Sequence, residues 1–155
     1  MPRPARPCVF CSIVAGETAA SVVAEEEHLI AFLDTAPLFP GHTLLVPQGH
    51  VQTFAELPAE LAVPFMAAAQ RLERAVENAM GADGSLLIVN NVVSQSVPHL
   101  HLHVIPRRRK DGLRLWLGPR HRYPTPEDAA STAERIAAAY RGDEAGRRPD
   151  PRQAR

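Results

Sequence analysis

The chain has 155 residues, with 17 basic and 17 acidic side chains and a formal net charge of zero at pH 7. Its composition, 45% hydrophobic and 22% charged, excludes a coiled coil, a collagen-like chain and a wholly disordered chain. No apolar run approaches the roughly 18–20 residues that a membrane span requires, and the N-terminal residues lack the apolar stretch of a signal peptide. We therefore expect a cytoplasmic protein with no membrane partner.

The elements expected in chain order begin with strands. Short apolar segments bounded by turn residues predict strands at 29–34, 43–47, 85–90 and 99–105. Apolar residues at steps of three and four predict a helix over residues 55–80, with a kink at Pro64 or a start near Val63 because proline lacks the N–H of an inner turn. A second helix is expected from an N-cap at Thr125 to Gly142.

This order of elements predicts an α+β fold with an antiparallel sheet and two main helices. At this length we expect one domain over residues 1–142. The polar, proline-broken residues 143–155 are expected to form a mobile C-terminal tail.

Charge is distributed unevenly along the chain. Residues 1–100 carry four Arg and ten acidic side chains, net −6, whereas residues 101–155 carry 13 basic and seven acidic side chains, net +6. The densest run is RRRK at residues 107–110. It either binds an anionic ligand or is a solvated turn, and we leave both open. No nucleic-acid partner is expected.

The only cysteines of the sequence, Cys8 and Cys11, form a CxxC motif. In a cytoplasmic chain this pattern indicates half of a metal site or a redox pair. The position after three prolines favours the metal site, because a thioredoxin-type motif would lie between a strand and a helix. A closed zinc site has four ligands, so the other two would come from the seven histidines.

Histidines alternate with apolar residues in VPHLHLHVIPR, residues 97–107. Because successive side chains of a strand point to opposite faces, we expect His99, His101 and His103 on one face and the intervening residues in the core. Three histidines on one face are costly to bury unless each has a partner or a chemical task. A polar outer face, a metal site and a site for a phosphate-bearing ligand are the alternatives.

The sequence resembles the histidine triad family of nucleotide hydrolases and transferases, whose signature is His-φ-His-φ-His-φ-φ with φ apolar. Residues 99–105 match this signature at every position. The resemblance covers residues 8–107 through CVFCSIVAGE, LIAFLDTAPLFPGHTLLVPQGH and QSVPHLHLHVIPR. It implies that two chains pair as a homodimer and that the ligand is a purine nucleotide or nucleotide conjugate.

The resemblance also implies roles for individual residues. His101 would attack the α-phosphorus of a nucleotide and form a nucleotidyl-histidine, while His103 would contact the phosphate or leaving group and assist proton transfer. Asp34 would hold the ribose hydroxyls. The remaining residues of the implied nucleotide site are Asn90, Gln95, Ser96, Val9, Phe10, Ile13, Phe32 and Leu33. For the last five, a plain core role is equally compatible with the sequence.

In the branch of the family that carries the CxxC motif, the resemblance implies a structural zinc ion. Its ligands here would be Cys8, Cys11, His50 and His99. A closed Cys₂His₂ site has no open position, so the metal would fix the chain and leave the chemistry to His101. His42 is interpreted as a structural histidine.

The sequence departs from the family between Asn90 and Ser96, where many members carry a longer, glycine-containing segment. NNVVSQS has no glycine, and glycine lets backbone amides approach a phosphate closely, so a different leaving-group geometry is expected. The implied function is hydrolysis of a nucleoside 5′-phosphoryl bond in a phosphoramidate or a dinucleoside polyphosphate. The alternatives are a nucleotidyl transferase or phosphorylase and a zinc-stabilised nucleotide-binding protein with little turnover.

Overall fold

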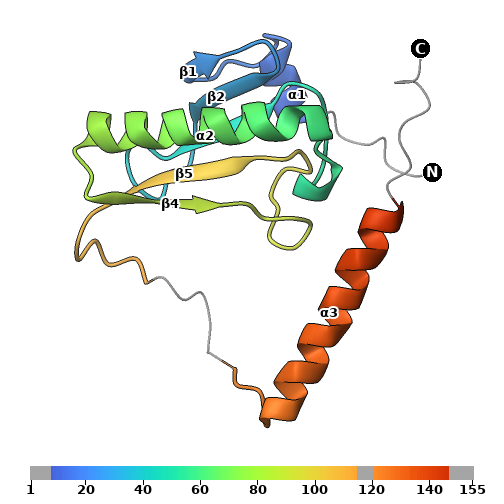
Figure 1. Ribbon diagram of the computed structural model, residues 1–155. Helices are drawn as coiled ribbons and strands as arrows, with labels where there is room; N and C mark the ends of the chain where they lie inside the picture. The colour runs from blue at the N-terminus through green and yellow to red at the C-terminus, as the bar shows by residue number, and fades with distance from the viewer. Residues whose placement is uncertain (1–7, 115–120, 147–155) are drawn as a thin grey trace, which may run out of the picture. The chain divides into compact units, whose positions relative to one another are not determined.

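Figure 1 shows the computed structural model of the chain, which describes residues 8–114 and 121–146. The chain divides into two compact units, Met1–Gly112 and Leu113–Arg155. The first contains the sheet and the helices α1 (Val9–Val14) and α2 (Ala59–Met80), and the second contains α3 (Pro126–Gly146). No helix in these described stretches is long and apolar enough to cross a lipid bilayer.

Within the described residues, five strands form one sheet in the order β1-β2-β3-β5-β4, and every neighbouring pair is antiparallel. The strands are β1 (Val22–Glu25), β2 (Leu29–Leu33), β3 (Thr43–Pro47), β4 (Gly84–Ile88) and β5 (Leu102–Arg107). The predicted α+β class with an antiparallel sheet is therefore confirmed.

The neighbouring strands β2 and β3 are buried on both faces, which explains why both are almost entirely apolar. Helix α2 lies across one face (Figure 1), where the buried sheet residues are Leu29, Ala31, Leu45, Leu102 and Val104. On the alternate positions a second cluster consists of Phe10 from α1 with Ile30, Phe32, Leu44 and Val46. This second face, which α1 covers only in part, carries the site described below.

Helix α2 begins at Ala59 and runs uninterrupted through Pro64, so the alternative of a start near Val63 is wrong, whereas a kink at Pro64 stays a prediction. Pro64 lies on the exposed side of the helix, and Phe65 beside it is almost fully buried. The helix ends at Met80 as predicted, and Gly81, with a positive φ of 58°, is its C-cap. Residues 55 and 56, the start of the predicted helix, belong instead to a separate 3₁₀ turn, Phe54–Glu56.

The predicted strands at 29–34, 43–47 and 85–90 agree with β2, β3 and β4 to within two residues. The strand predicted at 99–105 begins only at Leu102, so His99 and His101 precede it and the three histidines do not share one strand face. The reason lies in the backbone: Leu100 donates its N–H to the carbonyl of Val51 and not to a strand.

Helix α3 starts where predicted, with the Thr125 hydroxyl accepting the N–H of Asp128. It continues past Gly142 to Gly146, so the predicted tail of residues 143–155 begins inside a helix. Residues 147–155 lie outside the described part of the chain. The single domain over residues 1–142 stays a prediction.

Candidate functional site

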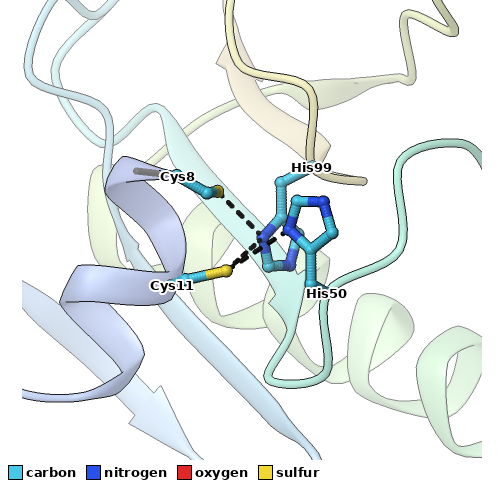
Figure 2. A group of neighbouring side chains, drawn as sticks. All are labelled: Cys8, Cys11, His50 and His99. Atoms are coloured by element: carbon cyan, nitrogen blue, oxygen red, sulfur yellow. Dashed lines mark hydrogen bonds between the residues drawn. The ribbon is translucent and has the colours of Figure 1, made fainter. Parts of the chain in front are cut away.

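Cys8, Cys11, His50 and His99 lie together although they come from three distant segments (Figure 2). The cysteines flank the start of α1, His50 follows β3, and His99 precedes β5. The Sγ of Cys8 lies 3.4 Å from Nδ1 of His99. The Sγ of Cys11 lies 3.3 Å from Nδ1 of His50 and 3.6 Å from Nδ1 of His99. All four ligand atoms lie within 4.8 Å of one another.

These distances fit a tetrahedral metal ion. Zinc bonds of about 2.3 Å to sulfur and about 2.0–2.1 Å to nitrogen place sulfur and nitrogen roughly 3.5 Å apart at tetrahedral angles. His99 also has the tautomer that a metal ligand needs. Its Nε2 donates to the carbonyl of Pro47 at 2.8 Å, so the lone pair on Nδ1 is left for a metal. The four predicted ligands therefore could hold zinc as a closed site.

The thiol of Cys11 shows no sign of redox activation. Burial and the neighbouring Cys8 raise the pKa of the Cys11 thiol above its usual value. A reactive redox cysteine has a lowered pKa. The geometry and the thiol chemistry both favour metal binding over a redox pair.

His101 is held in one orientation by the chain immediately before it. It is 2% exposed, and its Nδ1 donates to the carbonyl of His99 at 2.7 Å. Because the carbonyl is an acceptor only, the proton of neutral His101 is on Nδ1 and the lone pair is on Nε2. The ring packs edge-on against Phe10 at 5.2 Å and against His103 at 4.8 Å between ring centroids. The segment that carries His99 thus positions a basic nitrogen of His101.

His103 is the one triad histidine inside a strand, and its register places it opposite Leu44 of β3. Its Nδ1 lies 2.9 Å from Nε2 of His42. Burial, and next to it the neighbouring imidazoles of His101 and His42, lower the pKa of His103 to about 4. His103 is therefore neutral at physiological pH.

A cavity of about 240 Å³ opens between α1, the ends of β2 and β5, and the loop before His99. Both catalytic candidates, His101 and His103, line it together with Asp34 and Ser96. Of the predicted apolar residues, Val9, Phe10, Ile13, Phe32 and Leu33 also line it. Phe10 and Phe32 are at the same time core residues, so the cavity wall is part of the hydrophobic core.

Asn90 and Gln95 are the two predicted binding residues that the structure places outside the cavity lining. The amide of Gln95 joins its own loop to a distant segment: Oε1 accepts the N–H of Val92 at 3.0 Å, and Nε2 donates to the carbonyl of Gln52 at 2.7 Å. Gln95 thus braces the loop that carries Ser96. The loop contains two residues of positive φ that are not glycine, Val92 at 66° and Ser94 at 61°.

Sequence reasoning missed several residues of this cavity: Thr18, Ala19, Ala20, Thr35, Leu44 and Val97. Leu44 pairs with Phe32 across β2 and β3, so the strand register was a usable signal for it. His42, the partner of His103, was interpreted as merely structural, since its distance in sequence from the triad hides the contact.

Comparison with protein families finds a match between residues 15–110 and the model described as the HIT domain. The chain belongs to the HIT family. This confirms the resemblance inferred from the histidine motif and agrees with the fold, since a HIT family protein of Bacillus subtilis superposes with a TM-score of 0.78. That structure is 34% identical, and the match covers 86% of this chain and 96% of that one.

Several HIT relatives are similar over much of the chain. Protein hit of Bacillus subtilis is 36% identical over 140 residues, 85% of this chain and 96% of that protein. Adenosine 5′-monophosphoramidase hnt1 of Schizosaccharomyces pombe is 32% identical over 136 residues, 84% of this chain and 96% of the relative. Adenylylsulfatase HINT3 of Arabidopsis thaliana is 35% identical over 108 residues, 68% of this chain and 55% of that protein.

A zinc-bound histidine triad family protein of Mycobacterium smegmatis is similar in structure, with a TM-score of 0.66 and 34% identity. The match covers 85% of this HIT chain and 97% of that one. The similarity agrees with the fit of the Cys8, Cys11, His50 and His99 group to a metal ion.

Proposed function

We propose that this HIT protein hydrolyses a nucleoside 5′-phosphoryl bond through a nucleotidyl-histidine on His101. The observation that carries the proposal is the 2.7 Å hydrogen bond from Nδ1 of His101 to the carbonyl of His99, in a cavity shared with Asp34 and His103. It fixes the tautomer whose Nε2 can act as a nucleophile. The names of two relatives, an adenylylsulfatase and a phosphoramidase, support a nucleotide as substrate.

The reaction has two balanced steps. In the first, Nε2 of His101 forms a bond to the α-phosphorus, the bond from phosphorus to the leaving group breaks, and the leaving group departs with a proton taken from solvent. In the second, water attacks the same phosphorus, the P–N bond breaks, a proton of the water returns to solvent, and a nucleoside monophosphate and free His101 result. His103 hydrogen-bonds the phosphoryl oxygens or the leaving group during both steps.

The other lining residues position the nucleotide. The Asp34 carboxylate accepts hydrogen bonds from the ribose hydroxyls, and Ser96 faces the phosphoryl end. The base lies against the apolar wall of Phe10, Ile13, Phe32 and Leu33. Asn90 and Gln95 act on the phosphate side indirectly, through the loop that Gln95 braces. Of the two substrate classes, the phosphoramidase relative favours a nucleoside phosphoramidate over a dinucleoside polyphosphate.

We propose zinc as the ion of the Cys₂His₂ group, in a structural role. Zinc there supplies a cross-link between α1, the segment after β3 and the segment before β5. Because His99 is a ligand and its carbonyl accepts from His101, the cross-link also fixes the nucleophile. No step of the reaction uses the metal.

We also propose that two chains pair as a homodimer through the β4 edge of the sheet. In the described residues β4 has one strand neighbour, β5. Large apolar side chains are exposed on β4, at Leu87, and on helix α2, at Val63 and Met66. Light scattering during gel filtration would show twice the chain mass, and Leu87→Lys would reduce it to one chain. A cytoplasmic location stays a prediction.

The deciding experiment is intact-mass spectrometry after mixing the protein with adenosine 5′-phosphoramidate and quenching without acid within seconds. An adenylyl adduct on the wild type that persists in His103→Ala and is absent in His101→Ala supports the proposal. Transfer of the adenylyl group to phosphate instead of to water would identify a phosphorylase. Nucleotide binding without adduct or AMP, with zinc present, would overturn the hydrolase in favour of a binding protein.

A further inference from the structure

A second cavity, of about 450 Å³, lies on another part of the molecule. It is enclosed by the loop between β2 and β3, the C-terminal end of α2 and the end of β5 with the turn that follows. Its lining residues are Phe39, Pro40, Met80, Pro106, Arg108, Arg109, Lys110 and Asp111. It shares none of them with the cavity of His101. Its volume lies within the range of about 300–1,000 Å³ that small-molecule sites have.

One side of this cavity is apolar, and close packing fixes the position of its methionine side chain. Met80, at the end of α2, packs over Gly41, and a Cβ atom at Gly41 would lie 2.5 Å from Cγ of Met80. Gly41, at a φ of 93°, therefore leaves room for the Met80 side chain. Phe39 and Pro106 complete a wall of one aromatic ring, a thioether and a proline ring. Such a wall suits a flat, apolar group of a ligand.

The other side is a turn of consecutive basic residues that the fold holds in place. The Arg107 guanidinium forms two hydrogen bonds to the Asp111 carboxylate, from Nε at 2.5 Å and from NH2 at 2.9 Å. Arg108 donates from its guanidinium to the carbonyls of Gly81 and Met80 at the end of α2. Lys110 has a φ of 63°. Because these bonds already order the turn, binding of a ligand does not cost the entropy of ordering it.

The charges around this cavity do not cancel. Asp111 is the acidic residue of the lining, and its carboxylate is 8% exposed and occupied by Arg107. Asp83, outside the lining, accepts the backbone N–H of Arg109 at 2.8 Å. Within the described residues, the side chains of Arg109 and Lys110 make no hydrogen bond or ion pair. The cavity therefore presents basic side chains opposite an apolar wall, which together suit an anion with a ring system.

We propose that this cavity is a second nucleotide site, which binds a nucleoside polyphosphate with its base on the wall of Phe39 and Met80 and its phosphates on Arg109 and Lys110. Under this proposal the RRRK run is an anion-binding turn and not only a solvated one. It is separate from the hydrolytic site, and the proposal does not rest on the proposed hydrolysis. Its ligand is held and not cleaved, since none of the three triad histidines lines the cavity.

The test uses the full chain and α,β-methylene-ATP, whose P–C–P link replaces the bond that the nucleophile would break. Isothermal titration calorimetry measures the stoichiometry, and backbone amide NMR shifts locate each bound molecule. The variant Arg109→Glu/Lys110→Glu reverses the charge of the two cations that the proposal assigns to the phosphates. The matched control, Arg74→Glu/Arg135→Glu, changes the net charge equally at two exposed arginines outside both cavities.

We expect two molecules per wild-type chain, with shifts at Met80 and Lys110 for one and at Thr35 and Val97 for the other. The Arg109/Lys110 variant should bind the first at least tenfold more weakly while the control binds both. AMP release from adenosine phosphoramidate should be unchanged in this variant, which separates this proposal from the hydrolytic one. Equal weakening in the control, or wild-type shifts confined to the His101 cavity, would overturn the second site.

Discussion

The Nε2 atom of His42 lies 2.9 Å from Nδ1 of His103, and this contact determines which ring nitrogen of His103 carries the proton. Leu38 donates its backbone N–H to Nδ1 of His42 at 3.1 Å. In neutral His42 the proton must then be on Nε2, from where it is donated to Nδ1 of His103. The hydrogen-bond network thus assigns the proton of His103 to its own Nε2, as a neutral donor for a phosphate oxygen.

Replacing His42 by alanine should therefore lower kcat more than it raises KM. Loss of a positioning hydrogen bond of about 1–1.5 kcal/mol corresponds to roughly a tenfold lower rate. His42→Gln, whose side-chain amide can still donate toward His103, should recover part of the rate. Steady-state release of AMP measures both variants. The ¹⁵N shifts of the His103 ring report its tautomer, and an unchanged tautomer in His42→Ala would contradict the assignment.

The buried histidines also make stability depend on pH. The pKa of His103 is lowered from 6.5 to about 4 by burial and neighbouring imidazoles, and burial lowers that of His42 as well. Between pH 6.5 and 4 the unfolded chain consequently binds more protons than the folded one, so stability falls as the pH falls through this window. For His103 alone, the loss from pH 7 to pH 5 is about 1–2 kcal/mol.

Urea unfolding at pH 7 and pH 5 checks this dependence, with His103→Asn as the variant that cannot titrate. The free energy of unfolding of the wild type should decrease more between the two pH values than that of His103→Asn. Both proteins keep the metal-ligand group, so any acid release of the metal cancels in the comparison. Parallel decreases would show that His103 does not contribute.

The parts of the fold that the sequence predicts well are those with strong periodicity. The β2 and β3 segments are apolar because they are buried, and helix α2 buries one apolar stripe, so their bounds follow from this pattern, turn residues and Gly81. The strand β1 and the six-residue helix α1 give no such signal. All four residues of β1 are exposed, and α1 has no side-chain cap. Their positions depend on packing against distant segments.

The part of the site that could be predicted from the sequence is the part that belongs to, or follows from, the histidine motif of residues 99–105. The four metal-ligand candidates came from the family resemblance, because residues from three segments have no common spacing in sequence. The histidine alternation suggested a strand face, but hydrogen bonds of Leu100 and His101 with nearby carbonyls place His99 and His101 before the strand. His42 was missed because no periodicity connects it to His103.

Removal of the proposed zinc should destabilise the protein. Cys8→Ser and Cys11→Ser each take a thiolate from the group, and a loss of a few kcal/mol corresponds to a melting temperature lower by roughly 10 °C at this chain length. Elemental analysis should find one zinc ion per wild-type chain and less than a fifth of that in the variants. His28→Ala, at an exposed histidine outside the group, should keep the metal. Full zinc content in both cysteine variants would refute the ligand set.

The glycine-free loop beside the nucleotide cavity stores strain that glycine should relieve. Val92 has a φ of 66°, a region costly for a β-branched residue, and its side chain is 65% exposed. Val92→Gly should therefore raise the free energy of unfolding by about 0.5–1 kcal/mol, because little packing is lost and the strain is removed.

Val93→Gly is the matched control, since Val93 is 79% exposed and its φ is not positive. There glycine only adds freedom to the unfolded chain, and the free energy of unfolding should fall by about 0.5–1 kcal/mol. Urea unfolding of both variants gives the two signs, and a decrease in both would mean that Val92 is not strained. Because the loop carries Ser96 into the cavity, Val92→Gly should also raise KM for the phosphoramidate, as a looser loop must be ordered when the substrate binds.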